Sequence, residues 1–387
     1  MSKPSALNEA FSPGLEGVVA AETAISSVDG DQGELVIRGY AVEDLAPHAT
    51  FEEVAFLLWH STFPDRETLN RFRIDLSDRQ EIEPHTLALL KSAAVRSVPP
   101  MDALRMACGS LATRMADAGS ASERSAAARE DALRLIATFP VFVATYHRLS
   151  HGLQPIAPRR DLSLAGNFLY MLRGHEPPAD EVRALDTYLN TVADHGLNAS
   201  TFTARVIVST DSDVVSAVTG AVGALKGPRH GGAPGLALYQ VLEVGHADRA
   251  AAVLAAKLDR GERLMGFGHR IYRTRDPRAD VLNAAAEELF ASGRDRRIYD
   301  LARAVEASAL QLLRERKPDR VLQTNVEFYT ALVLHGLELP TPIFTPVFAM
   351  ARVAGWTAHC LEQMTANRLF RPESTYIGPR NRRITVI

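Results

Sequence analysis

The spacing of apolar positions predicts helices along most of the chain beyond about residue 50. In several segments apolar residues recur every three or four positions, which places them on one face of a helix. Such stripes are formed by Met101, Leu104, Cys108, Leu111 and Met115, by Val214, Val218, Ala221, Val222 and Leu225, and, in a helix expected over 346–363, by Val353, Trp356, Cys360 and the following Met364. The pattern therefore indicates an all-α fold.

The N-terminal stretch from Gly17 to Tyr40 has a different pattern. Short runs of β-forming residues lie at 18–19, 23–26 and 35–37, and turn-forming residues separate them. They predict a minor β element rather than a full sheet. Because strands do not alternate with helices, and no Gly-x-Gly-x-x-Gly or Walker motif occurs, a dinucleotide-binding α/β fold is not expected.

Two helix boundaries can be predicted from their capping residues. Lys226-Gly227-Pro228 ends the helix that begins near Val214, with Gly227 expected as the glycine just past the last turn. Asp276 and Pro277 are typical of an N-cap and a first helical residue. Arg278 then projects from the first turn of its helix. A guanidinium at a helix N-terminus favours the binding of a carboxylate.

Composition and net charge indicate the class of protein. The chain has 387 residues, a net charge of −3, 46% hydrophobic residues and 23% charged residues. These values are typical of a globular protein of about two domains and give no reason to expect nucleic-acid or membrane binding. The first residues lack the apolar core of a secretory signal, and the only two cysteines, Cys108 and Cys360, lack metal-ligand spacing. We expect a cytoplasmic protein with reduced, buried cysteines.

Four polar positions stand out as candidate chemistry. His195, His230 and His269 are each flanked by glycine, which lets backbone and substrate approach closely. Glu327 is an acid in an otherwise apolar stretch and is a candidate base with a shifted pKa. Three histidines can also ligate zinc, but their separations of 35 and 39 residues give no local ligand motif, so no metal is expected.

Cations are concentrated near the two glycine-rich loops that carry His230 and His269. The cluster suits a phosphorylated ligand such as a nucleotide or coenzyme A. Its members are Lys226, Arg229, Arg263, Arg270, Arg273 and Arg275. Taken singly, arginines such as Arg278, Arg352 and Arg371 are more often solvated surface residues, and a lone buried acid such as Glu327 is more often an ion-pair partner.

Together these motifs resemble citrate synthase over nearly the whole chain. The resemblance begins at Gly14-Leu15-Glu16-Gly17-Val18 and ends at Arg371-Pro372-Glu373-Ser374-Thr375-Tyr376-Ile377-Gly378. Its central motifs are His195-Gly196-Leu197-Asn198, Lys226-Gly227-Pro228-Arg229-His230-Gly231-Gly232, Gly266-Phe267-Gly268-His269 and Asp276-Pro277-Arg278. Their order and spacing are highly specific, and the length matches the short, dimeric type of the family.

The resemblance implies a large helical domain with an inserted small helical domain. The expected boundaries are 1–226 and 336–387 for the large domain, which carries the dimer interface, and 227–335 for the small one. The implied reaction condenses acetyl-CoA with oxaloacetate, giving citrate and CoA. Acetyl-CoA is then a substrate, and no resident cofactor is implied. Domain closure would exclude water from the reactive intermediate.

The resemblance also assigns roles to residues. Arg278 and Arg352 match the arginines that bind the carboxylates of oxaloacetate, and Arg371 matches the one supplied by the other subunit of a homodimer. His195 matches a further oxaloacetate contact, and His269 matches the group that polarises the ketone. His230 matches the donor to the thioester oxygen of acetyl-CoA. Arg273 matches a ligand of a CoA phosphate.

Glu327 is the one departure from the family motif, in which an aspartate is the base. Glutamate keeps the carboxylate but adds a methylene, and about 1 Å of misplacement can cost 10²-fold in rate. Either the loop is adjusted to glutamate or activity is weak or altered; the other matched positions are intact and favour a working base. The alternatives are 2-methylcitrate synthesis from propionyl-CoA, which differs by one methylene, and a non-catalytic protein that binds CoA or a dicarboxylate.

Overall fold

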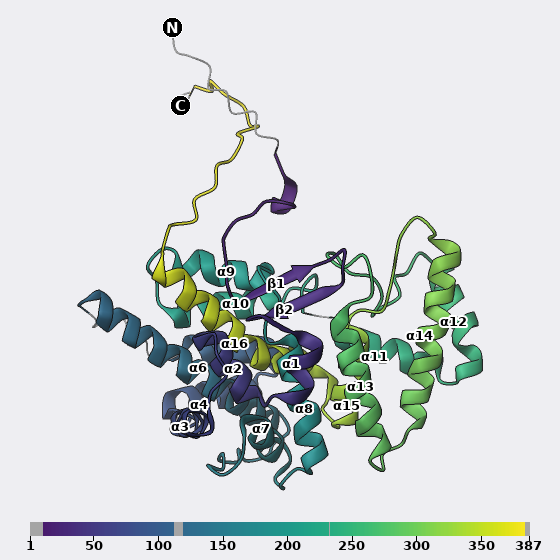
Figure 1. Ribbon diagram of the computed structural model, residues 1–387, viewed down its shortest axis with the longest axis horizontal. Coiled ribbons are helices and arrows are strands. Elements are labelled where there is room, and N and C mark those ends of the chain that lie inside the picture. The colour runs from purple at the N-terminus through teal and green to yellow at the C-terminus, as the bar shows by residue number, and fades with distance from the viewer. Residues whose placement is uncertain (1–10, 112–118, 232, 384–387) are drawn as a thin grey trace.

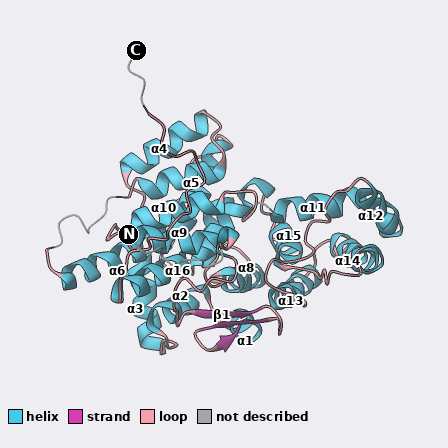
Figure 2. Ribbon diagram, turned by 90° about the horizontal axis from the view of Figure 1, so that it is seen from above, coloured by secondary structure: helices cyan, strands magenta, loops and turns pink. Residues whose placement is uncertain are grey.

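The computed structural model describes residues 11–111, 119–231 and 233–383, and these form a mostly helical molecule with one small sheet at its edge (Figures 1 and 2). The expectation of an all-α fold with a minor β element is confirmed. The first helices are α1 (Val42–His48), α2 (Phe51–His60), α3 (Arg66–Ser77), α4 (Pro84–Val95), α5 (Pro100–Gly109), α6 (Ala121–Ser150), α7 (Leu164–Arg173) and α8 (Ala179–Val192). They are followed by α9 (Ala199–Val208), α10 (Val214–Leu225), α11 (Ala233–Val244), α12 (Ala250–Asp259), α13 (Pro277–Ala291), α14 (Arg297–Arg316), α15 (Val326–Gly336) and α16 (Phe344–Thr365).

The small sheet covers a loop that carries candidate chemistry. It consists of β1 (Ser26–Asp29), β2 (Glu34–Ile37) and β3 (Tyr40–Ala41), paired antiparallel in that order. In the turn between β1 and β2, the carbonyl of Gly30 accepts a hydrogen bond from the Arg273 N–H at 2.8 Å. A Cβ on Gly30 would lie 2.3 Å from the carbonyl oxygen of Ile271, so glycine permits this close approach. The run at 18–19 lies outside the strands.

Helix α16 is the centre of the larger group of helices. It packs against α2, α6, α8, α9 and α10, and its residues are buried along most of its length. This explains why its apolar stripe is wider than one helix face, since a helix surrounded by others is apolar nearly all round. Both cysteines are buried in this core, as expected.

Two of the expected helix ends differ in detail. Helix α5 ends at Gly109, short of the predicted stripe, and Met115 lies outside the described residues. Helix α10 ends at Leu225 as expected, but Gly227 does not adopt the left-handed conformation of a capping glycine. Its N–H instead bonds to the Ala224 carbonyl at 3.2 Å, which tightens the last turn. Asp276 is confirmed as the N-cap of α13.

Helices α11 to α15 lie together on one side of the molecule (Figure 1). Within this group α13 and α15 pack against each other, and both also contact α8 of the larger group. The division into domains at 226/227 and 335/336 stays a prediction. No helix in the described ranges has both the length and the apolarity needed to span a membrane.

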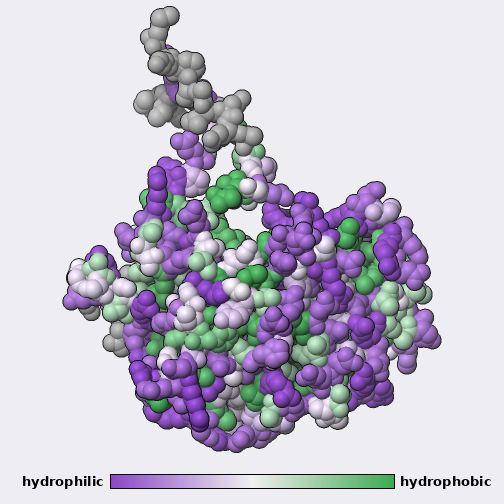
Figure 3. Space-filling view, in the orientation of Figure 1, coloured by the Kyte–Doolittle hydropathy of each residue, from purple (hydrophilic) through white to green (hydrophobic). Residues whose placement is uncertain are grey.

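Both terminal segments project beyond the body of the molecule in the view of Figures 1 and 3. Several of their apolar residues are exposed, among them Phe11, Val19, Leu369 and Ile377. At the base of these segments lies an open groove of about 900 Å³, lined by residues 20–24 and 368–372 together with α9 and the end of α16.

Candidate active site

Six of the predicted site residues come together between the two groups of helices. His195 follows α8, His230 follows α10, His269 precedes α13, and Arg278, Glu327 and Arg352 lie on α13, α15 and α16. The rings of His195 and His269 are 5.6 Å apart. The charges of Arg278 and Arg352 both bear on the pKa values of His195 and Glu327, and that of Arg352 bears on His230.

The loop that carries His269 is fastened to the segment that leads into α15. The Asn325 N–H donates to the Gly266 carbonyl at 3.0 Å, and the Gly268 N–H donates to the Gln323 carbonyl at 2.7 Å. Gly266 has a φ of 86°, and a Cβ there would lie 2.8 Å from the Cβ of Phe328. The glycines of this motif therefore serve close packing, and the loop that bears His269 is held to the strand-like approach to Glu327.

His269 is a neutral imidazole with its proton on Nε2. Burial, reinforced by the charge of Arg278, lowers the pKa of His269 to about 4. Its Nδ1 accepts from the backbone N–H groups of Ile271 at 3.0 Å and Tyr272 at 3.1 Å. A neutral ring whose Nδ1 accepts must carry its proton on Nε2. Because Nη2 of Arg278 lies 3.5 Å from that nitrogen, two donors point into one volume, which suits a carbonyl oxygen or a carboxylate.

His230 is also neutral, with the opposite tautomer. Burial and the charge of Arg352 lower the pKa of His230 to about 4. The backbone N–H of Ser200, in the first turn of α9, donates to Nε2 at 3.4 Å, and the Ser200 hydroxyl lies 2.8 Å from the same nitrogen. The same hydroxyl accepts from the Trp356 N–H at 3.0 Å and donates to Oδ1 of Asn198 at 2.8 Å. Because the backbone N–H of Ser200 can only donate, Nε2 of His230 accepts from it, and Nδ1–H of His230 is left as a donor.

Arg278 is buried in a bidentate ion pair with the N-cap of its own helix. Its Nε and Nη2 donate to the two carboxylate oxygens of Asp276 at 3.0 and 2.9 Å. Asp276 also accepts from the backbone N–H of Val326 at 3.1 Å, and so joins α13 to the start of α15. This pair orients the guanidinium, and the Nη1 edge can face a ligand.

Arg352 is a buried guanidinium without a carboxylate partner among the described residues. Its Nε donates to the Val192 carbonyl at 2.7 Å, and its guanidinium lies 4.7 Å from the ring centre of Phe348. Burial lowers the pKa of Arg352 to about 10. A buried charge is costly unless it is paired, so this arginine favours the binding of an anion.

Glu327 has the properties of a base that works near neutral pH. It occupies the first turn of α15, where the Asn325 side chain caps the helix by accepting from the Glu327 N–H at 3.0 Å. Burial raises the pKa of Glu327 to about 7, while Arg278 and Arg352 oppose the rise. Its Oε2 is buried and has no hydrogen-bond partner among the described groups.

His195 is held from both sides of the turn in which it lies. Its Nε2 is 3.1 Å from the hydroxyl of Tyr272. The preceding Asp194 is fully buried, accepts from the Gly196 N–H at 3.1 Å and lies 3.2 Å from Nε2 of His359 on α16. Burial, followed by the charges of Arg278 and Arg352, holds the pKa of His195 well below its usual value, so this ring is neutral.

Arg371 and Arg273 are not brought to this cluster. Arg371 is exposed on the C-terminal segment that leaves the body of the molecule (Figure 1), and within the described ranges its Nη1 donates to the Pro372 carbonyl at 3.1 Å. Arg273 is exposed and lies 3.3 Å from Asp31. The wider cation cluster is partly neutralised, since Lys226 pairs with Asp102 at 2.7 Å.

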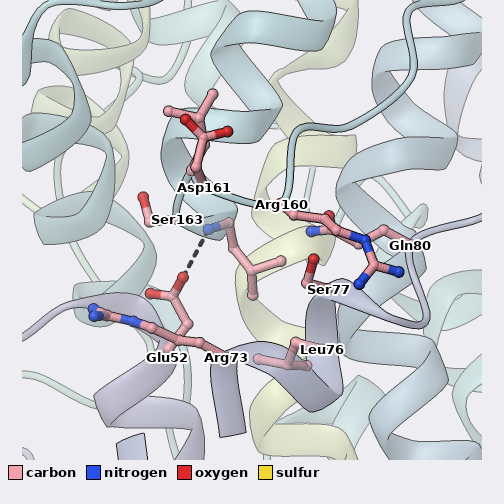
Figure 4. A pocket seen from close by; sticks show the side chains of 10 residues that line it. Glu52, Arg73, Leu76, Ser77, Gln80, Arg160, Asp161 and Ser163 are labelled. Atoms are coloured by element: carbon pink, nitrogen blue, oxygen red, sulfur yellow. Dashed lines mark hydrogen bonds between the residues drawn. The ribbon is translucent and has the colours of Figure 1, made fainter. Parts of the chain in front are cut away.

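Several site residues were missed by sequence reasoning, above all Asp276, Ser200 and Tyr272. Asp276 was noticed only as a helix cap, and neither the serine nor the tyrosine has a local pattern that sets it apart. A separate pocket between α2, α3 and α7 contains none of the predicted residues (Figure 4). There Glu52 accepts from the Leu164 N–H at 2.7 Å and anchors the start of α7. The described residues contain no group of three or more histidines, cysteines or acids placed to hold a metal ion.

Comparison with known proteins gives a consistent result. The family model for the C-terminal domain of citrate synthase matches residues 14–373. The chain is 40% identical to citrate synthase 2 of Bacillus subtilis, covering 95% of each chain, and 41% identical to a 2-methylcitrate synthase of Mycobacterium tuberculosis, covering 95% and 91%. A solved ternary complex of carboxymethyl coenzyme A and oxaloacetate with citrate synthase from Thermoplasma acidophilum superposes with a TM-score of 0.88 at 28% identity, covering 98% and 99%.

Proposed function

The chain belongs to the citrate synthase family, and we propose that it condenses acetyl-CoA with oxaloacetate to give citrate and CoA through the cluster described above. The observation that carries this proposal is that hydrogen-bond donors and a base lie together in one cluster. Two neutral histidines each have one nitrogen fixed as an acceptor, and a carboxylate with a pKa of about 7 stands beside two buried arginines. These groups are suited to transferring a proton beside an anionic substrate.

Oxaloacetate is proposed to bind between Arg278, Arg352 and His195. The two guanidinium groups offer planar donor pairs that match its carboxylates, and Arg352 gains the anion that its own surroundings lack. Nε2–H of His269 then donates to the ketone oxygen, because Nδ1 is already occupied by two backbone donors. That hydrogen bond draws electron density from the ketone carbon and makes it a better electrophile.

Acetyl-CoA is proposed to be activated by His230 and Glu327. Nδ1–H of His230 donates to the thioester oxygen, which becomes more negative as the enol forms. Glu327, when ionised, removes a methyl proton. Its raised pKa makes the carboxylate a stronger base than a solvated glutamate. The nucleophilic carbon so formed attacks the ketone of oxaloacetate and makes the new carbon–carbon bond. The resulting alkoxide accepts a hydrogen bond from His269 and takes up one proton, which balances the proton that Glu327 removed. Water then hydrolyses the thioester and releases citrate and CoA.

A homodimer is proposed to complete the site. Arg371 lies on a segment that projects from its own subunit, and we propose that it reaches the site of a partner. Exposed apolar residues on both terminal segments and the groove beneath them support an interface here. Arg273, exposed beside the His269 loop, is proposed to bind a phosphate of CoA. The reaction as proposed requires no resident cofactor.

The proposal is tested by measuring thiol release from acetyl-CoA and from propionyl-CoA, each with oxaloacetate. We expect faster release with acetyl-CoA. A preference for propionyl-CoA would instead assign 2-methylcitrate synthesis, because one methylene in the acyl pocket changes binding by only about 1–3 kcal/mol. Binding of oxaloacetate without thiol release from either thioester would make the protein a non-catalytic relative.

A further inference from the structure

One buried polar group next to this site has no role in the reaction as described. Tyr188 lies on α8 and is completely buried, yet its hydroxyl has no hydrogen-bond partner among the described groups. Buried hydroxyls in folded proteins nearly always have a partner, so each exception calls for an explanation. A phenylalanine would fill the same apolar space without this cost.

The position of Tyr188 on α8 places it near the reacting groups. Val192 is four residues further along α8 and so lies on the same face of the helix. The carbonyl of Val192 is the acceptor for Arg352 Nε, at 2.7 Å. Helix α8 also packs against α15, which carries Glu327 in its first turn. The charges of Glu327 and Arg352 both act on the pKa of Tyr188, so its hydroxyl lies near the substrate-binding arginine and the base.

The hydroxyl of Tyr188 and the carboxylate of Glu327 are complementary and both unsatisfied. Glu327 Oε2 is buried without a donor, and Tyr188 Oη is buried without an acceptor. Burial, followed by the negative charge of Glu327, raises the pKa of Tyr188 well above its usual value. The phenol therefore keeps its proton at every pH at which an enzyme of this kind is assayed, and it acts as a donor.

We propose that Tyr188 is a positioning residue that donates a hydrogen bond from Oη to Oε2 of Glu327 when the substrates are bound. This inference rests on the proposed function. The bond turns the carboxylate of Glu327 so that its other oxygen faces the methyl group of the thioester. It also gives this chain a means to direct the longer glutamate side chain, whose extra methylene adds a rotatable bond. The other charged groups that face Glu327 are Arg278 and Asp276 at the start of α13 and Arg352 on α16.

The test is Tyr188→Phe, which removes only the hydroxyl. We expect kcat to fall by about tenfold to a hundredfold, because the carboxylate of Glu327 is no longer held in its reactive orientation. KM for oxaloacetate should stay within about twofold of the wild-type value. The acid limb of kcat should move to higher pH by about half a unit or more, since a donor to the ionised carboxylate lowers its pKa. The melting temperature should stay equal or rise, because the lost hydroxyl has no partner.

The matched control is Tyr146→Phe. Tyr146 is a buried tyrosine of α6 whose hydroxyl donates to the Val98 carbonyl. This control should lower the melting temperature and leave the acid limb of kcat in place. An unchanged kcat and acid limb in Tyr188→Phe would overturn the inference, and so would a higher KM for oxaloacetate with an unmoved limb, which would place the hydroxyl on that substrate. Absence of turnover in the wild-type chain would instead overturn the proposed function.

Discussion

Backbone N–H groups fix the tautomers of two site histidines. Two N–H groups of the loop after His269 face its Nδ1, and one N–H at the start of α9 faces Nε2 of His230. These donors belong to the backbone, so they stay in place when side chains move. Each histidine thus presents a fixed proton to a substrate oxygen, and the low pKa values of both rings keep that proton count constant across neutral pH.

Glu327 is expected to be indispensable for turnover but not for substrate binding. Glu327→Gln keeps the size of the side chain and removes the base, so kcat should fall by about 10²–10⁴-fold. Oxaloacetate affinity, measured by calorimetry, should remain nearly intact because Arg278 and Arg352 are unchanged. A Gln variant with wild-type turnover would show that another group removes the methyl proton. Glu327→Asp is the matched control, and it should retain part of the activity.

The same carboxyl is expected to make stability depend on pH. The folded-state pKa of Glu327 is raised from 4.5 to about 7, so its contribution to stability is fully present below pH 4.5 and is lost as the pH rises through about 7. The loss amounts to at most roughly 3 kcal/mol. Glu327→Gln removes this pH dependence. The unfolding free energy of the variant should therefore rise relative to that of the wild type as the pH increases from 4.5 to 7. Urea unfolding at both pH values measures this, and a pH-independent difference would contradict the raised pKa.

At the scale of elements, Asp276 is the joint between the two helices that carry the substrate arginine and the base. It caps α13, pairs with Arg278 and accepts from the first N–H of α15. Helix N-termini stabilise negative charge, and this carboxylate uses two of them at once. A shift of α13 is therefore transmitted to α15, so the position of Arg278 and the position of Glu327 are set together.

Asp276→Asn is expected to weaken both functions of this joint. The amide NH₂ would face either both Nη2 of Arg278 and the Val326 N–H, or both Nε and the backbone N–H of Arg278, leaving a buried guanidinium without its counter-charge. Breaking such a buried pair costs about 3–5 kcal/mol of stability, which urea unfolding should detect, and KM for oxaloacetate should rise. Asp280→Asn removes an exposed partner of Arg275 on the same helix and should cost less than about 1 kcal/mol. Equal effects of the two changes would contradict the proposed joint.

Elements that depend on local chemistry could be predicted from the sequence. The spacing of apolar residues predicts helix α16, and the capping residues predict the start of α13. The glycine-flanked histidines lie in the turns where they were expected. Hydrogen bonds between residues far apart in the sequence could not be predicted. Asp276 looks like an ordinary cap, and nothing in its surroundings indicates a bond to Val326, fifty residues away. Gly227 failed as a capping glycine because the helix closes with a tighter turn instead.

At the scale of the whole molecule, the proposed dimer would add a third cation to the site of each subunit. Arg278 and Arg352 provide two guanidinium groups, and Arg278 is already paired with Asp276. The third matched arginine, Arg371, lies on the C-terminal segment, and among the described residues its side chain hydrogen-bonds to the Pro372 carbonyl rather than to a group of the cluster. The sequence could point to Arg371 through the resemblance alone, because the role proposed for it depends on the arrangement of two chains.

Complementation between subunits tests this arrangement. If Arg371 acts across the interface, a dimer of two Arg371→Ala chains lacks the third cation in both sites, and a dimer of two Arg278→Ala chains lacks the first. A mixed dimer carries both defects in one site and neither in the other, because the Arg278→Ala chain supplies its intact Arg371 to the site that keeps Arg278. Each single variant should therefore be nearly inactive, while mixed and re-associated chains should recover about a quarter of wild-type thiol release. This follows from random pairing, in which half of all dimers are mixed and each has one intact site. If Arg371 acts within its own chain, every mixed site retains one defect and no activity returns.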